Sequence, residues 1–123
     1  MPIMSSISCE DEYLFVKSEG FQKTISDHLK YFRSIFASAA KHKQRRILID
    51  NRDVTFTTDS YDNIKIADSL ESSLLQNMGF KAARIEREEQ LAPAKFFETV
   101  ALNRSLNLKA FPSEREALDW LLS

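Results

Sequence analysis

Four aspartates lie close together in the middle of the chain: Asp50, Asp53, Asp59 and Asp62. Clustered carboxylates are typical ligands of hard cations and typical groups in acid–base catalysis. Asp50 follows an apolar run at 47–49, and open α/β sheets bind ligands at the carboxyl ends of such strands. Aspartate is equally common in turns and at helix N-termini. We expect the turn and capping roles here, and we predict neither a metal site nor a catalytic residue.

The remaining chemically active residue types do not form a recognisable site. The two histidines, His28 and His42, fall in one predicted helix, about 21 Å apart along its axis, which is too far to share a metal ion. The basic run at 41–46 suits the end of that helix, and no aromatic residue interrupts it to stack on a base. Cys9 is the only cysteine. Walker, GxGxxG and CxxC patterns are absent from the sequence, so we predict no cofactor.

Composition places the chain among ordinary globular proteins. It has 123 residues, of which 43% are hydrophobic and 28% charged, with a formal net charge of −1. This length predicts a single domain over 1–123, and this charge gives no attraction to nucleic acid. No apolar stretch approaches the roughly 18 residues of a membrane span. The N-terminus does not resemble a signal peptide and the cysteine content suits a reducing compartment, so we expect a cytoplasmic protein.

The first half of the chain changes from strand to helix periodicity. Alternating segments at 3–9 and 13–17, joined by a polar turn at 10–12, predict an N-terminal antiparallel hairpin whose second strand is closed by Gly20. A helix over 22–43 is predicted by apolar residues at helical spacing, namely Ile25, Leu29, Phe32, Phe36 and Ala40. The run at 47–49 predicts a buried strand. The polar segment 51–59 predicts a loop, anchored by Val54 and Phe56.

The second half alternates helices with strands. A helix over 60–78 is predicted to be capped by Asp59 or Ser60 and to end at Gly79 in a left-handed conformation. A strand at 82–85, a helix beginning near Pro93 and a strand at 108–111 follow, and Ser113 opens a last helix with a capping box. The order β-β-α-β-α-β-α-β-α predicts an α/β fold with a mixed, largely parallel sheet.

This order resembles that of the STAS-like, SpoIIAA-like proteins of bacteria, and in particular the small stand-alone proteins of STAS/SEC14 type. The similarity is carried by the central strand ending in an acid at 46–50, by the helix segment 97–104, and by Phe111 followed by 116–121. It extends over nearly the whole chain. The resemblance implies a STAS-like fold and a regulatory role exerted on a protein partner.

One departure concerns the phosphorylated serine of regulators with this fold. Anti-sigma-factor antagonists carry an Asp-Ser-Ser-Gly turn after the central strand, whereas the corresponding segment here is 54–62 and keeps only Asp59-Ser60. A phosphate on Ser60 would meet a helix N-terminus, which favours it, and the carboxylates of Asp59 and Asp62, which repel it. We expect Ser60 to act as a capping residue rather than as a phosphorylation site.

These observations give three functional hypotheses. The preferred one is a non-enzymatic regulatory domain that binds a protein partner or a second copy of itself. Its contacts would be made by the exposed face of the second helix and by Asp50, Asp53, Thr57, Thr58, Asp59 and Ser60. The alternative is a CRAL-TRIO-like carrier of a small apolar molecule or lipid, in a cavity lined by Phe15, Phe32, Phe36, Phe96 and Phe97. An enzyme is the third, supported only by the aspartates.

Overall fold

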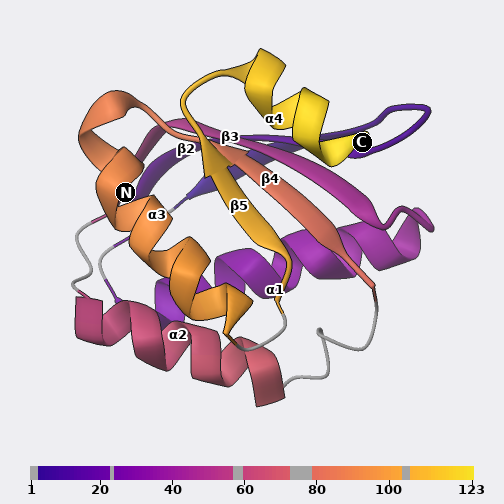
Figure 1. Cartoon of the computed structure of the whole chain (residues 1–123). Coiled ribbons are helices and arrows are strands. Elements are labelled where there is room, and N and C mark those ends of the chain that lie inside the picture. The colour runs from indigo at the N-terminus through magenta and orange to yellow at the C-terminus, as the bar shows by residue number, and fades with distance from the viewer. Residues whose placement is uncertain (1–2, 23, 57–59, 73–78, 104–105) are drawn as a thin grey trace.

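The structure, a computed structural model, describes residues 3–22, 24–56, 60–72, 79–103 and 106–123. Its elements follow one another in the predicted order (Figure 1). They are β1 (Met4–Cys9), β2 (Leu14–Gln22), α1 (Ile25–Lys41), β3 (Arg46–Phe56), α2 (Ser60–Ser72), β4 (Lys81–Ile85), α3 (Glu88–Leu102), β5 (Leu108–Phe111) and α4 (Glu114–Leu121).

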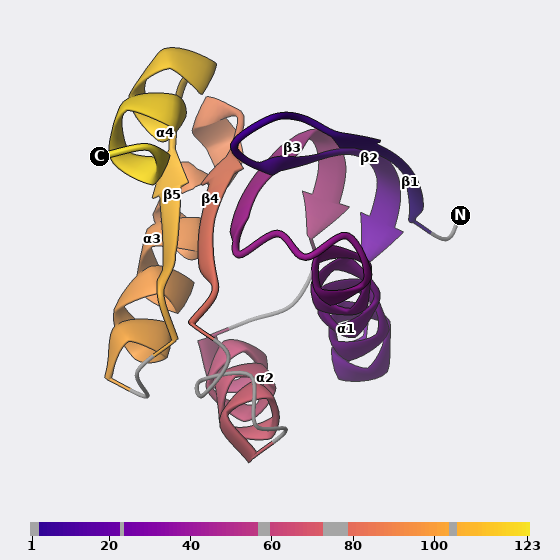
Figure 2. The same ribbon diagram turned by 90° about the vertical axis from the view of Figure 1, so that its right-hand side faces the viewer.

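The five strands form one sheet in the order β1-β2-β3-β4-β5. The β1–β2 hairpin is antiparallel and the other three pairings are parallel, as predicted. The prediction that β2 ends at Gly20 is wrong, because the strand continues to Gln22 and its last residues pair with β3. Because consecutive parallel strands are neighbours, right-handed crossovers place α1, α2 and α3 on the same face of the sheet. We call this the α1 face. The last helix, α4, covers part of the opposite face, the α4 face (Figure 2).

Each face has its own hydrophobic core. On the α1 face, the ring centres of Phe32 and Phe97 lie 5.6 Å apart and those of Phe36 and Phe80 lie 5.1 Å apart. One core cluster joins these residues of α1 and α3 to Ile47 and Ile49 of β3. On the α4 face, a smaller cluster joins Leu48, Ala83, Ile85 and Phe111 to Ala117 and Leu121 of α4. Alternate residues of β3 therefore serve different cores, which requires a strand that is buried on both faces.

The prediction of a loop over 51–59 is wrong for residues 51–56, which belong to a strand. β3 continues to Phe56, and its residues from Asp53 onward pair with β2 from Glu19 to Gln22. Between Lys17–Asp50 and Glu19–Asp53, β3 has one residue more than β2, so the strand bulges at this point. Asn51 and Val54 are fully buried. Polar residues lie in a strand here because other elements supply their hydrogen-bond partners, which sequence composition does not reveal.

Several helix boundaries also differ from the expectation. The third helix, α3, begins at Glu88, and Pro93 lies inside it. Glu88 and Glu89 suit the positive end of a helix, so the first turn extends ahead of the proline. α1 is shorter than predicted, and it is capped by Thr24, whose side chain accepts a hydrogen bond from Asp27 N. Ala40 is exposed, while the buried stripe instead includes Tyr31, Ile35 and Ala39.

Two local predictions are confirmed, the backbone conformation of Gly79 and the cap of the last helix. Gly79 adopts a left-handed conformation with φ of 71°. Ser113 caps α4, since its Oγ accepts a hydrogen bond from Glu116 N at 3.3 Å and also bonds the Glu116 carboxylate. The predicted part of the second helix at 73–78 lies outside the described residues. Across the described ranges, no helix combines the length and apolarity needed to cross a membrane.

The adjacent residues Phe96 and Phe97 provide a test of this packing. Phe97 is 3% exposed and Phe96 is 38% exposed. We expect Phe97→Ala to lower the free energy of unfolding by about 3–5 kcal/mol because it leaves a cavity beside Phe32. We expect Phe96→Ala, the matched control, to cost less than about 1.5 kcal/mol. Urea denaturation measures both, and equal losses would contradict the packing of α3.

Candidate functional site

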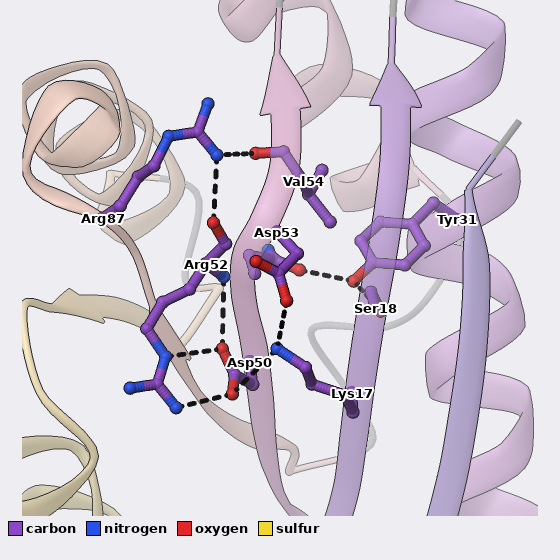
Figure 3. Close-up of polar contacts among 9 residues, drawn as sticks. Lys17, Ser18, Tyr31, Asp50, Arg52, Asp53, Val54 and Arg87 are labelled. Carbon is purple, nitrogen blue, oxygen red and sulfur yellow. Dashed lines mark hydrogen bonds and ion pairs between the residues drawn. The ribbon is translucent and has the colours of Figure 1, made fainter. Parts of the chain in front are cut away.

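Two sets of polar residues lie at the carboxyl-terminal half of β3, one on each face of the sheet. Figure 3 shows the contacts of Asp50 and Asp53 and part of the second set. Asp50 lies on the α4 face, since Leu48 two residues earlier belongs to the core of that face. Asn51 lies on the α1 face, where it contacts Tyr31 of α1. The two sets differ in exposure and therefore in the chemistry open to them.

The set on the α4 face consists of Lys17, Asp50, Arg52 and Asp53, which we call the charged cluster. Lys17 Nζ lies 3.3 Å from Asp50 Oδ2 and 2.9 Å from Asp53 Oδ2. Arg52 binds both carboxylate oxygens of Asp50, at 3.0 and 2.7 Å. The Asp50 side chain is 4% exposed, whereas those of Lys17, Arg52 and Asp53 are 40%, 49% and 63% exposed. A buried carboxylate therefore holds two cations at the surface.

Asp50 is poorly suited to acid–base chemistry near neutral pH. Burial would raise the pKa of its carboxyl, but hydrogen bonds from Arg52 and the charge of Lys17 outweigh burial and lower the pKa below its ordinary value. The carboxylate stays ionised and paired. Within the described part of the chain, no three His, Cys, Asp or Glu side chains lie close enough to hold a metal ion.

The structure brings together two of the predicted site residues. Asp50 and Asp53 share Lys17 as a partner. Thr57, Thr58 and Asp59 lie outside the described residues. Ser60 is the first residue of α2, and its side chain is also outside the described part. Asp62, the fourth aspartate of the sequence cluster, is in the first turn of α2, where a negative charge favours the helix.

The set on the α1 face is a chain of buried polar side chains, the buried network: Ser18, Tyr31, Asn51, Glu86 and Arg84. Tyr31 Oη lies 2.6 Å from both Ser18 Oγ and Asn51 Oδ1. Asn51 Nδ2 donates to Glu86 Oε2 at 3.2 Å, and Arg84 Nε donates to the same oxygen at 2.6 Å. These contacts link β2, α1, β3 and the end of β4 across the interior.

Glu86 is the least satisfied member of the buried network. It is 0% exposed, and its Oε1 has no hydrogen-bond partner among the described residues. Burial raises the pKa of its carboxyl, against the opposing effects of Arg84 and Asn51. Sequence analysis missed this network. Arg84 and Glu86 are two residues apart, a spacing that places both side chains on one face of an extended segment. Such an opposite-charge pair beside an apolar run could have indicated a buried ion pair.

A cavity of about 230 Å³ lies beside the buried network on the α1 face. Its apolar walls are Phe32, Phe56, Pro93, Ala94 and Phe97, and its polar wall is formed by His28, Arg84, Arg87, Glu89 and Gln90. Phe32 and Phe97 were predicted to line a cavity. The other predicted lining residues lie elsewhere: Phe15 packs on the α4 face, Phe36 contacts Phe80, and Phe96 is partly exposed.

Beside this cavity, side chains at the start of α3 form hydrogen bonds with the end of β3. β4 ends at Ile85, opposite Asp50, so the last residues of β3 have no β4 neighbour. Arg87 supplies donors instead, to the carbonyls of Arg52 and Val54 at 3.0 Å and to Thr55 Oγ1 at 3.1 Å. Gln90 accepts from Phe56 N and donates to the Val54 carbonyl. Side chains thus complete the backbone hydrogen bonding that a further strand would have provided.

His28 lines the cavity as a neutral side chain. It is 4% exposed, and its ring lies 5.2 Å from that of Phe56. Burial, together with the positive charge of Arg84, lowers its pKa from 6.5 to about 3, against a smaller opposing effect of Asp27. The unfolded chain therefore binds a proton at His28 between about pH 6.5 and 3, while the folded chain does not. This difference makes the folded state less stable as the pH falls through that range.

We expect His28→Gln to remove this pH dependence. Between pH 7.5 and pH 5, the unfolding free energy of the wild type should fall by about 1–2 kcal/mol more than that of the variant. The reason is that each pH unit below the pKa of His28 in the unfolded chain costs the wild type up to about 1.4 kcal/mol. Contributions of carboxyl groups cancel in the difference. His42→Gln, at the exposed end of α1, is the control. Parallel pH profiles of wild type and His28→Gln would contradict a neutral, buried His28.

Comparison with known proteins finds solved structures of similar fold, two of which are described here. No family model and no curated protein matches the chain. An uncharacterised protein of the DUF3478 family from Shewanella loihica PV-4, described as having a SpoIIAA-like fold, is 22% identical, with a TM-score of 0.55, over 98% of this chain and 94% of that one. An anti-sigma factor antagonist from Mycobacterium paratuberculosis is 17% identical, with a TM-score of 0.61, over 98% and 95%. The chain therefore has the STAS-like, SpoIIAA-like fold.

Proposed function

We propose that the chain is a non-enzymatic regulatory domain that binds a protein partner through the charged cluster. The observation that carries the proposal is the arrangement of Lys17, Arg52 and Asp53, which are exposed but held in place by contacts with the buried Asp50 or with one another. Charged side chains fixed before binding lose less conformational entropy on association than free ones do. They also favour partners of complementary charge and accelerate their encounter.

The position of the charged cluster supports recognition of another protein rather than of a small molecule. It lies on two paired strands, β2 and β3, which are a rigid support, and its side chains do not line the cavity. Arginine is enriched at protein interfaces. Thr57, Thr58, Asp59 and Ser60 follow β3 directly in the sequence, and we include them in the proposed surface.

The fold supports a regulatory role by analogy. The Mycobacterium paratuberculosis protein of this fold is described as an antagonist of an anti-sigma factor, that is, as a protein acting on another protein. The absence of enzymatic activity is proposed because Asp50, the most buried carboxylate of the charged cluster, has a lowered pKa and two cationic partners. We further propose that residues 1–123 act as one domain in the cytoplasm.

Site-specific photo-crosslinking in cells that natively produce the protein tests the proposal. A photoreactive amino acid at Asp53 should give a discrete crosslinked product with a second protein, identified by mass spectrometry. The same amino acid at Arg33, which is exposed on α1 on the opposite side of the sheet, is the matched control and should not give that product.

The same crosslink should depend on the cations of the charged cluster. Combining Lys17→Gln with Arg52→Gln should reduce its yield by roughly tenfold, because losing two interface charges costs on the order of 1–2 kcal/mol of binding free energy. Lys30→Gln with Arg33→Gln changes the net charge equally and should leave the yield unchanged. A product that forms equally from Arg33, or that survives the first pair of substitutions, would rule out the charged cluster as the binding surface.

A further inference from the structure

The cavity on the α1 face contains one cation whose hydrogen-bonding capacity is mostly unused. Arg84 lines the cavity, and its side chain is only 7% exposed. A guanidinium has five N–H donors. Arg84 uses Nε–H on Glu86 Oε2, and its two terminal amino groups have no acceptor among the described residues. Because these donors face the cavity, they are available to an acceptor that enters it.

The neighbouring polar groups of the cavity differ from Arg84 because they are already engaged. Both terminal amino groups of Arg87 donate to β3, and both ends of the Gln90 amide bond Val54 or Phe56. Glu89 is 74% exposed and lies 3.8 Å from Arg87 Nε. Glu86 holds the Nε edge of the Arg84 guanidinium, so Arg84 is the group left to meet a ligand.

The surroundings of Arg84 favour an anion that also carries an apolar group. The guanidinium carbon lies 5.0 Å from the ring centre of Phe56 and 5.9 Å from those of Phe32 and Phe97. Rings at these distances stabilise a desolvated cation and leave an apolar wall beside it. Pro93 and Ala94 extend that wall along α3. The two terminal amino groups present the planar fork that pairs with both oxygens of a carboxylate.

The size of the cavity limits the ligand to a small molecule. Its volume of about 230 Å³ is below the range of roughly 300–1,000 Å³ that is usual for drug-sized ligands. An apolar cavity of about 150 Å³ holds benzene. The space here therefore suits one ring or a short chain together with a single anionic group.

We propose that this cavity binds a small organic carboxylate, whose oxygens accept hydrogen bonds from Arg84 and whose apolar body lies against Phe32, Phe56 and Phe97. The proposal does not rest on the proposed function, because the cavity and the charged cluster lie on opposite faces of the sheet. Arg84 selects the charged group, and the phenyl rings select the remainder of the molecule.

Titration of the ¹⁵N-labelled full chain with acetate, benzoate and hexanoate tests this proposal. Benzoate or hexanoate should cause saturable NMR shifts, centred on the Arg84 side chain and on the amides of Phe56 and Ala94, in the millimolar range or tighter. Benzamide, the neutral analogue of benzoate, should bind at least about 10-fold more weakly, because it lacks the charge-assisted hydrogen bonds. Acetate and inorganic phosphate, which lack an apolar body, should also bind more weakly.

Two variants locate the binding. Arg84→Gln combined with Glu86→Gln removes the guanidinium without leaving a buried carboxylate unpaired, and should reduce benzoate affinity at least about 10-fold. Ala94→Leu fills the cavity, keeps Arg84, and should abolish binding. It tests the proposal even if the first variant does not fold. Arg115→Gln, on α4 and outside the cavity, is the arginine control and should bind as the wild type does. The proposal is overturned if no carboxylate saturates, if phosphate binds as tightly as benzoate, or if binding survives Ala94→Leu.

Discussion

Asn51 has to satisfy both ends of its amide inside the protein, because the residue is 0% exposed in the central strand. Its oxygen can only accept, so the Tyr31 hydroxyl donates to it, and its nitrogen donates to Glu86. This requirement fixes α1 against the sheet on one side and the end of β4 on the other. Glu86, held in this way, binds the Nε of Arg84 and sets the direction in which the remaining donors of Arg84 point. A misplaced Asn51 would leave several buried polar groups unpaired at once, each at a cost of about 1–3 kcal/mol.

The two faces of β3 follow from this arrangement. The strand bulges between Asp50 and Asp53, so that Asn51 faces the interior while both aspartates reach Lys17 on the α4 face. β3 also extends beyond the end of β4, and Arg87 and Gln90 of α3 supply the hydrogen bonds that a neighbouring strand would have made. The same residues form one wall of the cavity. A single strand that is longer than its neighbour therefore supports both the exposed charged cluster and the buried pocket.

Sequence patterns predicted the element order because hairpin alternation, the left-handed Gly79 and the Ser113 cap are local features. They failed over Asn51–Phe56, where polar residues form a strand because partners distant in the sequence satisfy them. Asp50 was recognised from its place after an apolar run, but its cations depend on strand register and on the bulge. Arg84 was missed because its burial results from rings contributed by α1, β3 and α3. Local sequence does not encode such long-range neighbours.

The central claim is that Tyr31, Asn51 and Glu86 act as one connected network. A double-mutant cycle of Tyr31→Phe and Glu86→Gln, with unfolding free energies from urea denaturation, measures it most directly. The quantities compared are the losses of unfolding free energy in the two single variants and in the double variant. Tyr31→Phe removes the hydroxyl, Glu86→Gln removes the negative charge, and both keep the size of the side chain. Because Asn51 bonds both partners, we predict a coupling energy of about 0.5–1.5 kcal/mol. Losses that add to within about 0.3 kcal/mol would contradict the connection through Asn51.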